Sequence, residues 1–181
     1  MDQSQLLRQL LPVFREQGYE GATLNKLAAA TGLGKASLYH HFPGGKAEIA
    51  ATLLRHAVAR LEKLAFSRLR KGGSATKRLE EFVDGFSAYT EHGTSPCVIA
   101  AFSQGSAWQL HGDNIAQQFR VWNGLLAATF EAAGQKPKRA QREASTLLGQ
   151  LYGELQLSRL QGEPRNFRRS IKRIKKQLPA A

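Results

Sequence analysis

The sequence has little of what holds secreted or metal-bound proteins together. One cysteine in 181 residues excludes a disulfide framework and a multi-cysteine zinc site. No apolar run approaches the roughly 18 residues of a membrane span, and the N-terminus lacks the basic start and apolar stretch of a signal peptide. We therefore expect a cytoplasmic protein with no membrane partner, long enough to fold around its own core.

Acidic residues are also scarce. The chain carries 26 Lys and Arg against 14 Asp and Glu, a formal net charge of +12. Such an excess favours an anionic partner, with nucleic acid first and a membrane surface second. Residues 136–181 hold twelve basic and three acidic side chains, whereas residues 1–47 hold five and three. One alternative is therefore a non-specific nucleic-acid or anionic-surface binder that acts through the basic C-terminal helix.

Alternating runs of Val, Ile and Thr, which would indicate strands, are missing. Apolar residues instead recur at intervals of three and four, as on one face of a helix. Pro12 predicts either a kink in the first helix or a late start of that helix, and Gly18 predicts its end. The pattern predicts an all-α fold of about nine helices, near residues 6–17, 24–31, 35–42, 46–71, 74–93, 96–109, 113–133, 137–161 and 164–178.

The two short helices at 24–31 and 35–42 are the most informative. The small residue Ala28, then Gly32, then the apolar Leu38 have the spacing that is typical of a helix-turn-helix. A helix face made of small, hydroxyl-bearing, aromatic and imidazole side chains is better suited to insertion into a DNA groove than to simple exposure to water. At 100° per residue, the second helix presents this face outward through Ala36, Ser37, Tyr39 and His40.

Groups suited to binding phosphate surround this face. The helix that Thr23 caps offers free backbone N–H groups and a partial positive charge to a phosphate. Lys46 adds an ammonium group at the start of the next helix, and Lys26 and Lys35 add further cations. The predicted DNA-binding residues are Thr23, Lys26, Lys35, Ala36, Ser37, Tyr39, His40 and Lys46.

These residues carry a resemblance to a known family. The stretch from Gly18-Tyr19 through Leu38-Tyr39-His40-His41-Phe42-Pro43 to Lys46 resembles the DNA-binding domain of the tetracycline-repressor (TetR) family, and Pro96-Cys97 is similar to its LmrA-like branch. The loop before Lys46 is one residue longer than is common in the family. The resemblance implies a homodimeric repressor on a palindromic operator in double-stranded DNA. It also implies a helix-turn-helix domain at 1–47 and a helical ligand-binding and dimerisation domain at 48–181.

The family further implies a pocket for a small-molecule inducer among the middle helices. With few carboxylates nearby, an apolar or aromatic ligand is expected if a cavity exists. The alternative is that each aromatic side chain is ordinary core. The residues able to line the pocket are Phe86, Tyr89, Phe102, Trp108, Phe119 and Trp122.

A protein that binds a two-fold symmetric DNA site must be a dimer. The last two predicted helices offer apolar faces for a dimer interface. We expect a four-helix interface built from both subunits, with intramolecular core as the alternative. The residues concerned are Leu147, Leu148, Gly149, Leu151, Gly153, Leu155, Phe167, Ile171 and Ile174.

Signals of catalysis are missing. The sequence shows no nucleophile–base pairing, glycine-rich phosphate loop, paired carboxylates or metal-ligand spacing, so we expect no enzyme, cofactor or metal site. Cys97 at a helix start is either a redox-sensitive thiol or a small buried hydrophobe, and the second interpretation is favoured.

Overall fold

All the secondary structure in residues 2–179, which the computed structural model describes, is helical. Those residues form nine α-helices and two short 3-10 helices without a strand, which confirms the all-α prediction. The chain divides into two compact units, one made of Met1–Val58 with Pro96–Ile115 and the other of Ala59–Ser95 with Ala116–Ala181. Helices α4 and α7 each contribute to both units.

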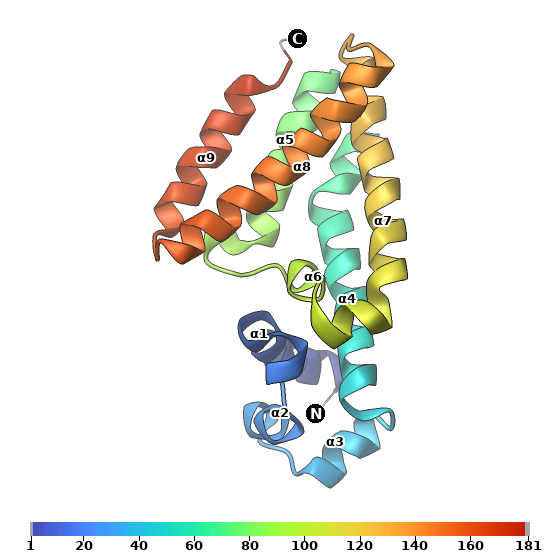
Figure 1. Cartoon of the computed structure of the whole chain (residues 1–181), viewed down its shortest axis with the longest axis vertical. Helices are drawn as coiled ribbons and strands as arrows, with labels where there is room; N and C mark the ends of the chain where they lie inside the picture. The colour runs from blue at the N-terminus through green and yellow to red at the C-terminus, as the bar shows by residue number, and fades with distance from the viewer. Residues whose placement is uncertain (1, 180–181) are drawn as a thin grey trace. The chain divides into compact units, whose positions relative to one another are not determined.

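The first unit packs around aromatic side chains of α1 and of the segment that ends α6. Phe14, Tyr19 and Phe102 are buried, with ring centroids 5.7 to 6.4 Å apart. This cluster holds α6 against α1, although the two helices lie far apart in the sequence (Figure 1). The unit comprises α1 (Gln3–Gly21), α2 (Leu24–Thr31), α3 (Lys35–His41), the first part of α4 (Gly45–Leu64), α6 (Val98–Ala101) and the first part of α7 (Gly105–Ala132).

The second unit has Trp122 in its core. The Phe66 ring stacks on the indole with centroids 4.4 Å apart, and the indole Nε1–H donates to the Glu62 carboxylate at 2.8 Å. At Gly85, α5 passes so close to the end of α4 that a Cβ atom would lie 2.0 Å from the Leu64 carbonyl oxygen. Helices α8 and α9 pack side by side, and α5 contacts α9 (Figure 1). The unit comprises the remainder of α4, η1 (Phe66–Arg70), α5 (Ala75–Tyr89), η2 (Glu91–Gly93), the remainder of α7, α8 (Pro137–Leu160) and α9 (Pro164–Gln177).

Several predicted helix boundaries are wrong. The fourth helix ends at Leu64, not near residue 71, and a 3-10 helix follows it. The sixth is only four residues long, and α7 begins at Gly105, so Asp113 lies inside α7 and does not cap it. The non-helical dihedral angles inside α1 belong to Gly18 (φ 66°, ψ −174°) and not to Pro12. Glycine adopts a positive φ at little cost, which makes it the natural place for the chain to kink.

The expected domain boundary after residue 47 differs from the division into units. Helix α4 continues through this position, and residues 96–115 pack with the N-terminal helices. The functional division into 1–47 and 48–181 stays a prediction. No helix within the described range is both long and apolar enough to cross a membrane.

Candidate nucleic-acid interface

The helix-turn-helix is shaped by caps that the local sequence supplies. The Thr23 hydroxyl accepts a hydrogen bond from the Lys26 backbone N–H at 3.4 Å, which caps α2. Gly32 ends α2 in the left-handed conformation with φ 67°, so the chain turns sharply into α3. Helix α3 starts after Gly34 with no side-chain cap. The sequence therefore sets both the turn and the start of each helix.

Helix α3 has one buried face and one exposed face. Leu38 and Phe42 are completely buried, and they anchor the helix to the first unit. The exposed side includes Tyr39, whose accessible fraction of 44% is large for an aromatic residue. This side is formed by Lys35, Ala36, Ser37, Tyr39 and His40, all of which are exposed. The outward orientation expected from helical spacing is present, and the DNA contacts themselves stay a prediction.

The loop between α3 and α4 is ordered by two contacts. The Gly44 backbone N–H donates to the Glu48 carboxylate at 2.7 Å, which ties the loop to the first turn of α4. Gly45 has φ 61°, and a Cβ atom there would lie 3.0 Å from Cε1 of Tyr39. The Tyr39 ring therefore packs over the loop while keeping much of its surface exposed. Helix α4 begins at Gly45, one residue before the expected Lys46.

Lys46 is the one predicted DNA-binding residue that is half-buried. Its ammonium group donates to the Tyr19 backbone carbonyl at 3.0 Å and lies 4.2 Å from the centroid of the Tyr19 ring. Lys26 makes similar contacts, because its ammonium group donates to the Gly21 carbonyl at 3.2 Å and to the Gln17 side chain. Both lysines thus bind the C-terminal end of α1 and hold the helix-turn-helix against it.

Glu20 is a residue that sequence reasoning missed. Its carboxylate accepts a hydrogen bond from the Ser106 backbone N–H at 2.6 Å, and so supplies the cap at the start of α7. That bond lowers the pKa of the Glu20 carboxyl group, and the neighbouring positive charge of Lys46 lowers it further. Because the two bonded residues are 86 positions apart, no local pattern could have indicated the pair. The end of α1 is therefore bonded to the starts of both α4 and α7.

The six aromatic ligand candidates fall in both units. Phe102 belongs to the aromatic core of the first unit, where Trp108 is 43% exposed and lies over Gly112. The second unit holds the rest of them, where Phe86 and Phe119 also contact Tyr152, a residue that the sequence pattern does not single out. The members in the second unit are Phe86, Tyr89, Phe119 and Trp122.

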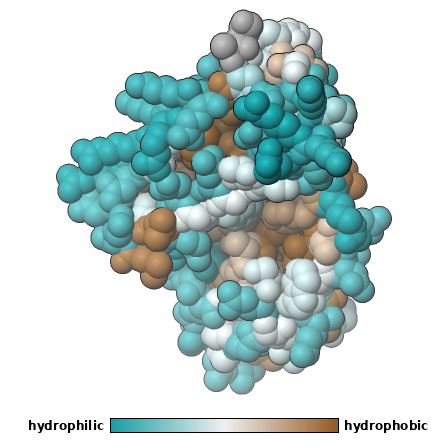
Figure 2. Space-filling view, turned by 45° about the horizontal axis from the view of Figure 1, so that its top comes forward, coloured by the Kyte–Doolittle hydropathy of each residue, from teal (hydrophilic) through white to brown (hydrophobic). Residues whose placement is uncertain are grey.

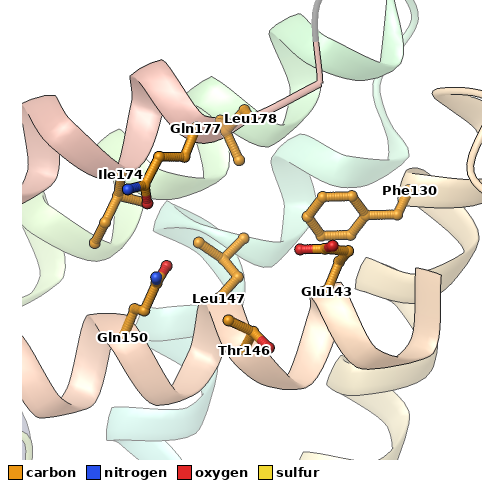
Figure 3. A pocket seen from close by; sticks show the side chains of 8 residues that line it. All are labelled: Phe130, Glu143, Thr146, Leu147, Gln150, Ile174, Gln177 and Leu178. Carbon is orange, nitrogen blue, oxygen red and sulfur yellow. The ribbon is translucent and has the colours of Figure 1, made fainter. Parts of the chain in front are cut away.

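Two pockets in the second unit are lined by other residues. The one shown in Figure 3 has a volume of about 70 Å³ and lies where α7, α8 and α9 meet. The other has about 350 Å³ and lies along η1 and α5. The first is lined by Phe130, Glu143, Thr146, Leu147, Gln150, Ile174, Gln177 and Leu178. The second is lined by Leu64, Arg68, Lys71, Glu81, Asp84, Gly85 and Ala88. A ligand-binding role for the six aromatic residues stays a prediction.

The apolar side chains expected at a dimer interface are buried within the chain. They pack α8 and α9 into the core of the second unit, and a role for these helices in a dimer interface stays a prediction. Of the nine residues, only Gly149 and Gly153 are exposed. The same outer face of α8 carries Leu157 and Leu160, which are 53% and 84% exposed. The buried members are Leu147, Leu148, Leu151, Leu155, Phe167, Ile171 and Ile174.

Groups with reactive or metal-binding chemistry are few. Cys97 is 3% exposed at the start of α6, in agreement with its interpretation as a small buried hydrophobe. In the part of the chain that the structure describes, no group of three or more His, Cys, Asp or Glu side chains is arranged to hold a metal ion.

The N-terminal helices match a known family. The profile described as "Bacterial regulatory proteins, tetR family" matches residues 6–53. LmrA, an HTH-type transcriptional regulator of Bacillus subtilis, is 50% identical over 38 residues, which cover 21% of this chain and 20% of LmrA. AcnR, an HTH-type transcriptional repressor of Corynebacterium glutamicum, is 41% identical over 51 residues, 28% of this chain and 27% of AcnR. The matches to these two relatives thus span about a fifth to a quarter of their length.

Longer matches extend over the remaining helices. YxaF, an HTH-type transcriptional regulator of Bacillus subtilis, is 22% identical over 150 residues, 81% of this chain and 78% of YxaF. A TetR transcriptional regulator from Legionella pneumophila has the same fold, with a TM-score of 0.80, 17% identity and 98% of each chain covered.

Two structures of regulators in complexes also share the fold. A cysteine mutant of CifR with 26-bp operator DNA has a TM-score of 0.75 and 19% identity, covering 99% of this chain and 98% of CifR. AibR with isovaleryl coenzyme A and operator DNA has a TM-score of 0.65 and 19% identity, covering 83% and 85%. These relatives are transcriptional regulators and not enzymes. The helix-turn-helix at residues 6–53 is therefore a domain of the TetR family of bacterial regulatory proteins, and the described chain has the fold of solved TetR regulators.

Proposed function

We propose that this protein is a homodimeric repressor that reads a palindromic operator with α3 and leaves it when a small ligand binds. The observation that carries the proposal is the division of α3 into a buried anchor, Leu38 and Phe42, and an exposed face centred on Tyr39. A helix that projects from a packed domain in this way can enter the major groove. The operator complex of CifR, which shares the fold, supports this role.

Within the interface, we assign roles by side-chain chemistry. Ala36 and His40 are placed to meet base edges, and Lys35 lies at the rim of the groove. The hydroxyl groups of Ser37 and Tyr39 are suited to phosphate oxygens. Thr23 presents the N-terminus of α2 to the backbone. Lys26 and Lys46 hold the domain together through their bonds to α1, and each ammonium group retains a donor for a phosphate.

Dimerisation follows from the geometry of the target. Two α3 helices must lie roughly 34–36 Å apart to enter successive major grooves on one face of the duplex. The exposed strip of α8 around Gly149, Gly153, Leu157 and Leu160 is suited to a two-fold contact. A Cβ atom would meet nothing within 4 Å at either glycine, so a partner helix can approach the backbone closely. A regulator that binds chromosomal DNA acts in the cytoplasm, and we propose that location.

A ligand can release the operator if it binds one arrangement of the protein more tightly than the arrangement that binds DNA. AibR, whose structure holds isovaleryl coenzyme A together with operator DNA, supports a ligand-responsive role. We propose a small apolar or aromatic inducer near the aromatic side chains of the second unit. The Glu20–Ser106 and Lys46–Tyr19 bonds would transmit a displacement of α7 or α4 to the end of α1, which packs on α2.

Footprinting on the DNA upstream of its own gene tests the proposal. The protected fragment then serves as the operator in titrations with Tyr39→Ala, which removes the ring, and Tyr39→Phe, which removes only the hydroxyl. We expect Tyr39→Ala to weaken operator binding at least tenfold, with dimer mass and helix content unchanged. Tyr39→Phe should lose about 0.5–1.5 kcal/mol, the usual worth of one hydrogen bond. Equal binding by Tyr39→Ala and the parent would show that the reading surface lies elsewhere.

A further inference from the structure

Most of the positive charge of this protein lies outside its helix-turn-helix. The first unit carries six basic and five acidic residues, whereas the second carries twenty and nine. The DNA-reading unit is therefore nearly neutral, and almost the whole excess lies on the other unit. Reading by α3 leaves that excess unexplained.

Helix α9 carries the densest part of this charge. It holds seven Arg and Lys and no acidic residue between Pro164 and Gln177. Its apolar side is buried against α8, α5 and η2. In Figure 2, hydrophilic side chains predominate at the upper left of the view, on the side where α9 lies in Figure 1, and a small hydrophobic patch lies below them. The buried side consists of Phe167, Ser170, Ile171 and Ile174.

Three of the seven cations are neutralised within the chain. Arg165 bonds to Glu163 at 2.7 Å, Arg173 bonds to Glu154, and Lys175 bonds to Asp84 at 2.7 Å. The other four are exposed, and none has an acidic partner within 4 Å among residues 2–179. They lie within an arc of about 100° and span about 12 Å along the helix. We call Arg168, Arg169, Lys172 and Lys176 the α9 basic face.

We propose that the α9 basic face binds the phosphate backbone of double-stranded DNA without sequence preference, as a second DNA contact in addition to α3. Like charges this close repel one another unless an anionic partner covers them. A row of cations spaced along a rigid helix matches a polymer with regularly spaced phosphates, and the arginine fork suits phosphate oxygens. Such contact would hold the protein near the chromosome after α3 has left its operator.

The structure favours DNA over a lipid surface. An amphipathic helix that binds a membrane inserts its apolar side between the lipids. In α9 that side is already in the core, and the outer side offers no apolar residue. Binding to the outer side is therefore electrostatic only, as with a DNA backbone.

The test compares two full-length variants with the same net charge. One changes the α9 basic face, R168Q/R169Q/K172Q/K176Q. The control, K63Q/K77Q/R120Q/K138Q, removes four exposed cations that are scattered over α4, α5, α7 and α8. Circular dichroism and thermal midpoints first establish that both variants are folded. Anisotropy with a labelled non-operator duplex at several salt concentrations then gives the affinity and its salt dependence.

We expect the α9 variant to bind the non-operator duplex at least tenfold more weakly than the parent. The plot of log K against log salt concentration should become less steep by about 2 to 4, since each lost phosphate contact reduces the size of the slope by about 0.9. The scattered control should lose less than about one contact. Equal losses in the two variants, no loss in either, or a parent that does not bind this duplex would overturn the proposal. So would an α9 variant that keeps duplex binding but loses binding to phosphatidylglycerol vesicles. Operator reading by α3 is measured separately with Tyr39→Ala, so either proposal can fail alone.

Discussion

Replacing Lys46 by methionine would remove the ammonium group that joins the start of α4 to the end of α1, while keeping most of the aliphatic stem. The lost interactions are the 3.0 Å hydrogen bond to the Tyr19 carbonyl and the cation–π contact at 4.2 Å. A hydrogen bond to a charged group contributes about 1.5–3 kcal/mol, at the lower end for a half-buried site. The cation–π contact adds about 0.5–1 kcal/mol. Because the two share one ammonium group, we expect a loss of about 2 kcal/mol.

Urea unfolding followed by circular dichroism measures this loss. With a slope of about 2 kcal/mol per molar, the midpoint should fall by about 1 M. Lys46→Arg keeps the charge and serves as the control. Operator titrations at several salt concentrations distinguish a lysine that only positions α4 from one that contacts DNA directly. Each lost phosphate contact reduces the size of the slope of log K against log salt concentration by about 0.9. We expect a lower midpoint, weaker operator binding and a salt dependence that is less steep by about 0.9, because the ammonium group both positions α4 and offers a donor to a phosphate. An unchanged midpoint together with a slope lower by about 0.9 would refute the positioning role.

Two further predictions concern stability. Gly85→Ala places a Cβ atom 2.0 Å from the Leu64 carbonyl oxygen, so we expect a loss of about 3 kcal/mol or more and a thermal midpoint lower by roughly 6 °C or more. Gly72→Ala, which meets nothing within 4 Å, should change the midpoint little, and equal shifts in the two variants would contradict the close crossing. Burial lowers the pKa of His111, whose ring stacks on Phe102, so the unfolded chain binds more protons below pH about 6.5. Stability should therefore fall as the pH drops from 7.5 to 5.5, and less steeply in His111→Gln, as urea midpoints would show; identical pH dependence would exclude a contribution from this histidine.

Features that depend on neighbours within one or two helical turns can be predicted from the order of the residues. Thr23 and Ser74 cap their helices through bonds to backbone N–H groups three residues later, and Gly32 ends α2 with a positive φ. Helical spacing also separates the buried Leu38 from the exposed Tyr39. These features follow from local backbone geometry and the 3.6-residue period. The amino-acid sequence is therefore sufficient to locate the helix that we propose to read DNA.

Contacts between distant groups depend on how the whole chain packs. Helix α7 starts at Gly105 because the Glu20 carboxylate bonds to the next backbone N–H, and Lys46 bonds to α1 as well as lying near the predicted DNA surface. The leucines of α8 are buried by α9 and the rest of the second unit, so periodicity identifies their face but not its partner. Hydrophobic burial is non-directional, and one apolar stripe serves equally for a core or an interface. The partner of such a stripe is therefore set by the tertiary fold.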